Sequence, residues 1–201
     1  MKFSKSLLTL IFAIEIAIWL LVSRSLKPLI IIAAILIHEV GHVTVSVMTG
    51  SKLTLLDLQI GGLKLSCNKG YKNRFAEVSI ALGGPLFNVL STLPFIAFRH
   101  LEAKYFVQLS LGLALLNLLP IREFDGGRVF ERLLAVVLPL DLALKIGEII
   151  SFFTLFSLWC ISIYLILRTG RNLSFFIFSF SVFFRMLADP QNRRICKIME
   201  E

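Results

Sequence analysis

The sequence has 201 residues, of which 57% are apolar and 18 are Phe, and its mean hydropathy is +0.84. These values lie outside the range of soluble domains and predict an integral membrane protein. The net charge is +8, but the basic residues form no cluster large enough to predict nucleic-acid binding. We therefore expect a lipid bilayer, and no nucleic acid, as the partner of these charges.

Apolar stretches of about 20 residues can cross roughly 30 Å of hydrocarbon as helices. Such stretches predict an all-α protein with about six transmembrane spans, near 7–23, 28–49, 77–98, 103–120, 145–167 and 172–187. The first begins like a signal peptide but lacks a small-x-small cleavage site, so we expect it to be retained. The stretch 129–144 carries Glu131, Arg132 and Asp141. We interpret it as an interfacial or half-buried helix continuing from the fourth span; a seventh span is the alternative.

Six spans place both termini on one side of the membrane. The loops and ends on that side hold 15 of the 21 Lys and Arg, against six on the other side. Cytoplasmic loops carry the excess of basic residues, so we predict cytoplasmic termini. The small design, made of spans alone, favours a bacterial plasma membrane. Cys67, Cys160 and Cys196 show no paired spacing, and we predict no structural disulfide.

The only long early loop, 50–76, contains LTLLDLQIGGLKLSC, in which two partly alternating runs flank Gly61 and Gly62. This pattern predicts a small β-hairpin over 53–67. We see no internal repeat and no room for a separate soluble domain. Residues 1–201 are therefore expected to form a single polytopic domain, with a core at 28–130 and the last two spans at 145–187.

The stretch ILIHEVGHVTVSV places two histidines and a glutamate inside an apolar helix. His38 and His42 are four residues apart and so lie on one helix face, with Glu39 beside them. This H-E-x-x-H arrangement is typical of zinc hydrolases, in which the histidines bind Zn²⁺ and the glutamate moves protons. Ionisable groups at membrane depth are costly and usually serve a function. We predict a metal site here.

A catalytic zinc needs a third protein ligand. Spacing alone leaves several candidates open: Glu15, Asp57, Glu77, Asp125, Asp141 and Glu148. In ALLNLLPIREFDGGRVFERLL, Pro120 ends the fourth span and Asp125 precedes two glycines. Read by itself, this Asp125 could equally be a helix N-cap in a turn.

Three motifs together resemble the site-2 proteases, which are intramembrane zinc metalloproteases. They are HEVGH in the second span, GGPLFN at 83–88 in the third, and NLLPIREFDGGR at 117–128. The layout is similar to the branch of the pro-sigma-K processing protease of spore formers, here without the PDZ insert or the CBS pair of other relatives. The motifs span roughly residues 30–130.

The resemblance implies that His38, His42 and Asp125 bind one Zn²⁺ per chain and that Glu39 is the general acid and base. It also implies that Asn117 holds the substrate backbone or stabilises the oxyanion; a helix–helix hydrogen bond is the alternative. For GGPLFN the simplest interpretation is close packing and a kink beside the metal-bearing helix, and we assign Asn88 no direct catalytic role. Arg122 and Glu123 depart from the residues of many relatives.

We therefore expect an endopeptidase that cuts peptide bonds in or near membrane-associated segments of other proteins. The resemblance points to regulated proteolysis of a transcription factor or pro-sigma factor, and so to sporulation. The alternatives are a catalytically silent membrane binding or quality-control factor and a metal transporter, although a transporter should show repeated spans. A membrane-protein inhibitor and a homo-oligomer are left open as further partners.

Overall fold

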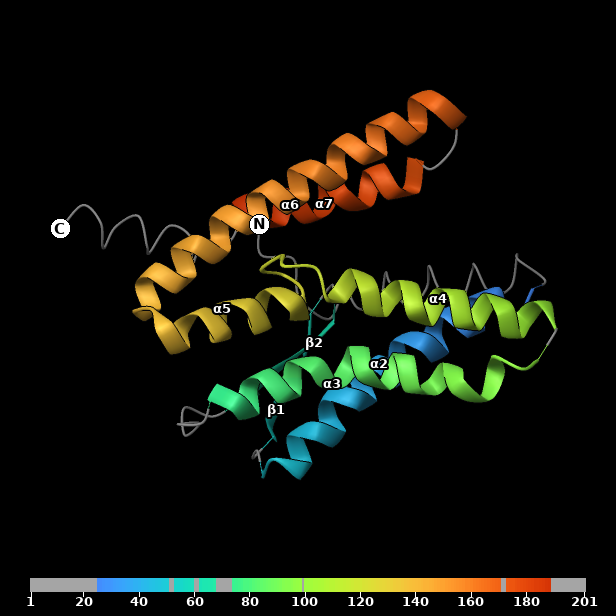
Figure 1. Cartoon of the computed structure of the whole chain (residues 1–201). Coiled ribbons are helices and arrows are strands. Elements are labelled where there is room, and N and C mark those ends of the chain that lie inside the picture. The colour runs from blue at the N-terminus through green and yellow to red at the C-terminus, as the bar shows by residue number, and fades with distance from the viewer. Residues whose placement is uncertain are drawn as a thin grey trace, which may run out of the picture. The chain divides into compact units, whose positions relative to one another are not determined.

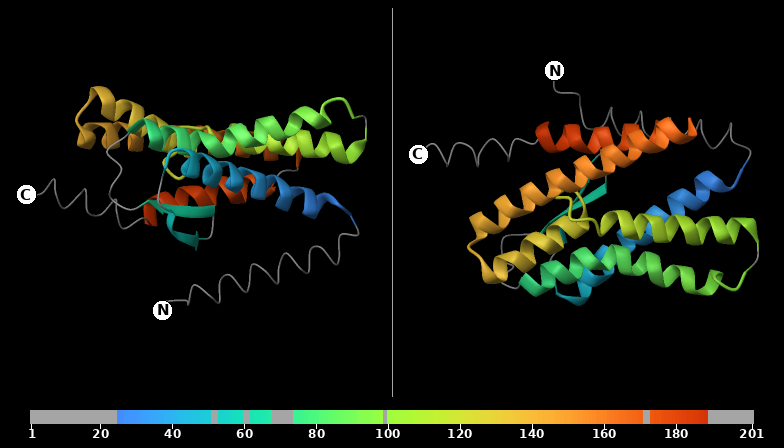
Figure 2. Two further views of the ribbon diagram at one scale, coloured as in Figure 1. Left: turned by 90° about the horizontal axis from the view of Figure 1, so that it is seen from below. Right: turned by 45° about the horizontal axis from the view of Figure 1, so that its top comes forward.

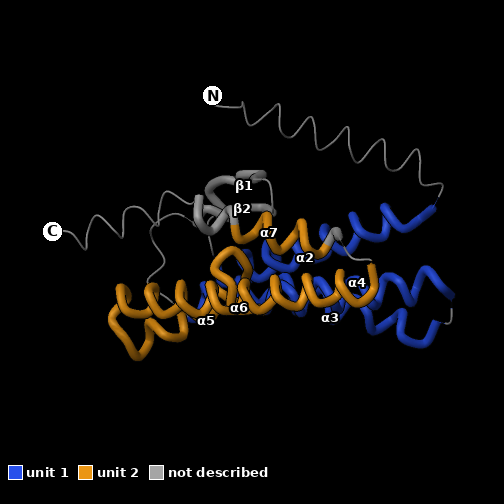
Figure 3. Tube along the Cα trace, turned by 90° about the horizontal axis from the view of Figure 1, so that it is seen from above, with its two compact units in different colours: residues 1–118 blue, residues 119–201 orange. Residues whose placement is uncertain are grey.

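The computed structural model describes residues 25–50, 53–59, 62–67, 74–98, 100–170 and 173–188. The predicted first span at 7–23 and Glu15 lie outside the described residues. The chain divides into two compact units, residues 1–118 and 119–201 (Figure 3).

The described residues of the first unit form three helices and a short 3₁₀ turn: α2 (Lys27–Met48), α3 (Arg74–Thr92), η1 (Leu93–Phe95) and α4 (Leu101–Asn117). Helix α2 packs against both α3 and α4, and α3 lies beside α4 (Figures 1 and 2). Pro28 stands in the first turn of α2, where its missing N–H costs no helical hydrogen bond. Helix α3 continues through Pro85.

The predicted hairpin is confirmed at the level of the backbone. Strand β1 (Leu53–Gln59) pairs with β2 (Gly62–Cys67) in an antiparallel register. Asp57 lies opposite Lys64, and the register is irregular between Leu53 and Leu56. The hairpin therefore falls at the place that the alternating pattern predicted.

The second unit contains α5 (Asp125–Val137), α6 (Leu140–Thr169) and α7 (Leu173–Ala188). Both α5 and α7 pack against the long helix α6 (Figure 1). The buried hydrophobic core of this second unit includes Ile121, Leu155 and Val182, which pack together. Between α6 and α7, Trp159 stacks on Phe183 with ring centroids 6.1 Å apart. These contacts bury aromatic area on the facing sides of the two helices.

The prediction of one helix over 129–144 is wrong in its boundaries. The structure shows α5 ending at Val137 and α6 beginning at Leu140. Pro139 is the cause, because a proline disfavours helical backbone in the residue before it, and Leu138 is extended at φ −114°, ψ 156°. The fifth span was predicted at 145–167, and the helix found there, α6, begins five residues earlier, at Leu140. The predicted fourth span, 103–120, is shorter, since α4 ends at Asn117.

Among the described residues, three helices are long and apolar enough to cross a membrane: 27–48, 75–95 and 140–169. Helices α4 and α7, with 17 and 16 residues, stand at two further predicted spans. Large apolar side chains are exposed on these helices, including Leu36 and Val40 of α2. Such exposure is what a lipid-facing surface requires. The all-α membrane fold is thus confirmed.

Candidate metal centre

His38 and His42 lie one turn apart on the buried face of α2. Their side chains are each 6% exposed, and their Nε2 atoms are 3.2 Å apart. Two imidazole nitrogens at about 2.0–2.1 Å from a tetrahedral zinc would be separated by about 3.3 Å. The pair therefore has the spacing that two ligands of one zinc ion need.

One stripe of α3 faces this pair and consists of Ile80, Gly84 and Asn88, which follow one another at intervals of one turn. His42 Nδ1 lies 2.8 Å from the carbonyl oxygen of Ile80. His38 Nδ1 lies 3.1 Å from Nδ2 of Asn88. Helix α3 thus holds the outer nitrogen of each ring, and the two Nε2 atoms turn toward each other.

Glycines allow α2 and α3 to come this close. A Cβ on Gly84 would lie 2.5 Å from Nε2 of His42 and 2.7 Å from Nε2 of His38. A Cβ on Gly83 would lie 2.7 Å from the carbonyl oxygen of Gly41. Real Cβ atoms do not approach other atoms so closely, so a side chain at either position would push the helices apart. The predicted packing role of GGPLFN is confirmed.

Two further predicted residues lie in the first unit. Glu39 follows His38 on α2 and is half-buried. Asn117 is the last residue of α4 and is also half-buried; its Nδ2 donates to the carbonyl oxygen of Leu113 at 3.0 Å. An amide group carries two N–H donors, so this bond leaves Asn117 one N–H for another acceptor.

Asp125 is the first residue of α5, in the second unit, and is 6% exposed. The helix N-cap is Phe124, so the structure does not show Asp125 in the alternative N-cap role. Its Oδ1 lies 3.6 Å from an exposed guanidinium nitrogen of Arg128. The positive end of the helix dipole also favours a carboxylate in the first turn.

The turn that precedes Asp125 is hydrogen-bonded to α6. The backbone N–H of Arg122 donates to Oγ of Ser151 at 2.9 Å, and that hydroxyl donates to the carbonyl oxygen of Gly147 at 2.7 Å. Gly127 permits a close approach to the carbonyl of Ile121, which a Cβ would block. The start of α5 therefore has a fixed place within its own unit.

Among the other third-ligand candidates, Glu77 and Glu148 are half-buried and Asp141 is exposed. Asp57 lies in β1, and Glu15 lies outside the described residues. Asp125 is the buried carboxylate among the candidates whose side chains are described. Burial distinguishes it where sequence spacing did not.

The profile of the family described as peptidase M50B-like matches residues 10–185. The chain belongs to the peptidase M50B-like family. Among solved structures, a similar one is the site-2 protease from Methanocaldococcus jannaschii, at 22% identity and a TM-score of 0.62, over 89% of this chain and 85% of that chain. A comparison with the curated proteins found no match. The structural similarity concerns the fold.

This M50B-like protein is thus a membrane metalloprotease of a family of zinc enzymes. The residues of α2 and α3 fit such an ion. Two histidines offer Nε2 atoms at the ligand spacing, their Nδ1 atoms are held in hydrogen bonds, and Gly84 leaves the adjoining space free of a side chain. Hydrogen-bonded outer nitrogens are typical of metal-binding histidines. The predicted resemblance to the site-2 proteases is confirmed at the level of the family.

Glu131, which is not among the predicted site residues, has a carboxyl group whose pKa differs from its usual value. Burial raises the pKa of Glu131 in α5, and the charge of Arg122, whose Nε lies 3.8 Å from Glu131 Oε1, only partly offsets this. Helix α5 has 13 residues, about 20 Å, which is too short to span the bilayer. Glu131 is therefore a charge that the second unit buries at a cost.

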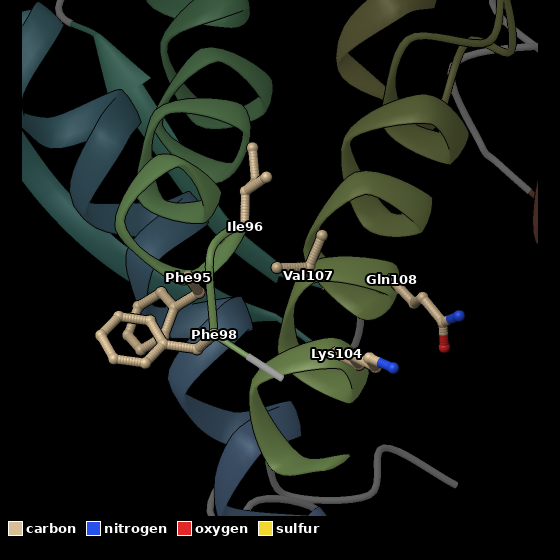
Figure 4. A pocket seen from close by; sticks show the side chains of 6 residues that line it. All are labelled: Phe95, Ile96, Phe98, Lys104, Val107 and Gln108. Carbon is tan, nitrogen blue, oxygen red and sulfur yellow. The ribbon is translucent and has the colours of Figure 1, made fainter. Parts of the chain in front are cut away.

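A shallow hollow lies where η1 leads into α4, and it contains none of the predicted site residues (Figure 4). Its lining residues are Phe95, Ile96, Phe98, Lys104, Val107 and Gln108. Its lining has one amine and one amide among apolar groups, with no base to activate a nucleophile and no set of metal ligands. We assign this hollow no part in the chemistry.

Sequence reasoning missed the hydrogen bonds from α3. From the sequence, Asn88 was assigned no direct catalytic role and its function was left open, yet its amide contacts His38 directly. Ile80 contributes a backbone atom that no sequence motif reveals. A signal was available for Asn88. It lies four residues after Gly84, so both share one face of α3, and a buried amide on such a face needs a polar partner.

Proposed function

We propose that the chain is an intramembrane zinc endopeptidase in which His38, His42 and Asp125 together bind one Zn²⁺. The observation that carries the proposal is the 3.2 Å separation of the two histidine Nε2 atoms on the buried face of α2. Two histidines and one carboxylate, with an open position for water, are a known ligand set of catalytic zinc. Burial of Asp125 supports its selection as the third ligand.

A zinc ion bound there would supply Lewis acidity toward water and toward the substrate carbonyl. Glu39 is the neighbour of His38 on α2, and we assign it the proton transfers: it takes a proton from the attacking water and gives it to the leaving amine. Its side chain is half-buried, and its place next to His38 in the sequence of α2 supports this assignment. The reaction is hydrolysis of a peptide bond.

Asn117 would stabilise the charge that develops on the attacked carbonyl oxygen. Its remaining N–H is suited to this, because the other N–H of the same Nδ2 donates to Leu113 and so fixes the orientation of the amide at the end of α4. A preorganised donor of this kind lowers the barrier more than a mobile one. The same N–H could hold the substrate backbone in place before reaction.

The substrate would be a membrane-associated segment of another protein, unwound locally so that its peptide bond is accessible. The β1–β2 hairpin offers a strand edge with which an extended segment could pair. By resemblance, regulated cleavage of a transcription factor or pro-sigma factor, as in sporulation, is the proposed setting. Substitution of hairpin residues by proline tests the pairing: unchanged cleavage would remove the hairpin from substrate binding.

Residues 1–201 would form a single protease domain in a bacterial plasma membrane, with cytoplasmic termini. The excess of basic residues on one side supports this orientation. A membrane-protein inhibitor or a second copy of the chain could regulate access. Neither is needed for the chemistry.

The decisive experiment compares the wild-type protein with Glu39→Gln, at equal expression, for cleavage of a panel of tagged membrane substrates and for zinc content after purification. We expect cleavage to fall by about 10²–10⁴-fold while zinc is retained, because the glutamate moves protons and is not a ligand. Equal cleavage by both proteins would remove Glu39 from the mechanism. Zinc retained without cleavage by either would favour the catalytically silent factor, and zinc transport across vesicles would favour the transporter.

A further inference from the structure

The hydrogen bonds around His38 and His42 determine where the ring protons lie. The carbonyl oxygen of Ile80 can only accept, so His42 Nδ1 carries a proton and donates at 2.8 Å. In a neutral imidazole the other nitrogen is then unprotonated, which leaves His42 Nε2 with a lone pair. His42 is therefore held by α3 in the tautomer that a metal ligand needs.

His38 has a different partner, because Asn88 offers both a donor and an acceptor on one amide group. With Nδ2 toward the ring, as at the observed 3.1 Å, His38 Nδ1 accepts and the proton lies on Nε2. With Oδ1 toward the ring, Nδ1 donates and Nε2 has a free lone pair. A half-turn of the amide exchanges these two arrangements without moving the backbone.

The surroundings of Asn88 leave this half-turn available. Asn88 is completely buried, and its Oδ1 has no hydrogen-bond partner among the described residues. A buried acceptor without a partner costs free energy, so the amide has no second bond that holds it in one orientation. Within the described part of the chain, no other side chain forms a hydrogen bond with this amide.

We propose that Asn88 is a positioning residue, whose Oδ1 accepts the Nδ1–H of His38 and thereby selects the tautomer that binds zinc through Nε2. The inference rests on the proposed zinc site. Asn88 touches neither substrate nor metal in this role. It acts on the ligand, as the carboxylate or carbonyl partners of other zinc-binding histidines do.

The experiment measures zinc affinity of the purified full-length protein in detergent, by competition with a fluorescent chelator. Asn88→Leu keeps much of the volume but removes the acceptor, and we expect about 10–100-fold weaker binding. Asn88→Asp keeps an acceptor of the same shape and should bind zinc within about threefold of wild type. Ser91→Ala is the matched control, since this hydroxyl bonds only the backbone carbonyl of Asn88, at 2.8 Å.

A second readout follows the tautomer itself. In protein with ¹⁵N-labelled histidine and bound zinc, the resonances of wild type and Asn88→Asp should show His38 protonated at Nδ1. Size exclusion and thermal unfolding identify any variant that has lost its fold, and Asn88→Asp, which has the size of asparagine, provides the test should Asn88→Leu unfold.

The outcomes separate the two proposals. Wild-type affinity in Asn88→Leu, or a folded Asn88→Asp with affinity lowered more than tenfold, would overturn the role of Asn88 and leave the zinc site standing. A wild-type protein that binds no zinc would overturn the proposed function and this inference with it.

Discussion

A Cβ atom on Gly84 would lie 2.5 Å from Nε2 of His42, so this glycine of α3 leaves free of a side chain the volume next to the nitrogen that we propose as a zinc ligand. The same Cβ would lie 2.7 Å from Nε2 of His38. Both values are far below a van der Waals contact, and an imidazole ring held by a hydrogen bond at Nδ1 cannot move aside freely. The absence of a side chain at position 84 is thus part of the site.

Gly84→Ala should reduce zinc affinity by at least tenfold, because the methyl group displaces the histidine rings from their ligand positions. Gly112→Ala in α4 is the control, since a Cβ there meets no atom within 4 Å. Alanine favours helix over glycine by up to about 1 kcal/mol, so Gly112→Ala should keep its zinc and gain slightly in stability. Chelator competition and thermal unfolding measure both effects. Equal zinc affinity in the two variants would contradict this account of Gly84.

The histidine pair could be predicted from sequence because it depends on one helix alone. Residues four apart share a face of any α-helix, and His38 and His42 do so here. The hydrogen bonds from Ile80 and Asn88 could not be predicted in the same way. They depend on how α3 packs against α2, and a periodic pattern shows which face is buried without showing what it meets.

The helix boundaries illustrate a second limit. Hydropathy alone joined α5 to the start of α6, since the stretch 129–144 is largely apolar. The break depends on a local conformational rule, the extended backbone of Leu138 before Pro139, which an averaged hydropathy does not register. The hairpin of β1 and β2, by contrast, was predicted because alternation and glycine give a local signal.

Asp125→Ala should abolish tight zinc binding, because two histidines alone make an incomplete set of ligands. Arg128→Ala provides the comparison. Its guanidinium lies 3.6 Å from Asp125 but is about half exposed, and ion pairs of this kind contribute about 0–1 kcal/mol. Metal analysis of both purified variants checks the prediction. If folded Asp125→Ala protein retained its zinc, Asp125 would not be the third ligand, and Glu77 or Glu148 would be tested next.

Ser151→Ala should destabilise the second unit by about 1 kcal/mol, because the part-buried backbone N–H of Arg122 would lose its acceptor. Ser157→Ala on the same helix is the matched control. That hydroxyl is exposed and bonds only the carbonyl of Phe153, so its loss should change stability by less than about 0.5 kcal/mol. Thermal unfolding in detergent compares the two. Equal melting temperatures would show that Ser151 does not anchor the turn before α5.

The raised pKa of Glu131 allows us to predict how the free energy of unfolding depends on pH. Its pKa in the folded protein is raised above the usual 4.5, chiefly by burial; Arg122, Arg132 and Arg128 act in the opposite direction and Glu148 in the same one. The folded state therefore holds this proton more tightly than the unfolded state. Stability linked to the proton is fully present below about pH 4.5 and is lost as the pH rises through the raised pKa.

Glu131→Gln removes the charge but keeps the shape, so at about pH 7.5 the variant should melt at a higher temperature than wild type. The difference should shrink as the pH falls toward about 4.5, where the wild-type carboxyl is also neutral. Unfolding is best followed with EDTA present, so that bound metal does not add to stability. A variant that melts below wild type at pH 7.5 would mean that the ion pair with Arg122, at 3.8 Å, outweighs the cost of burial.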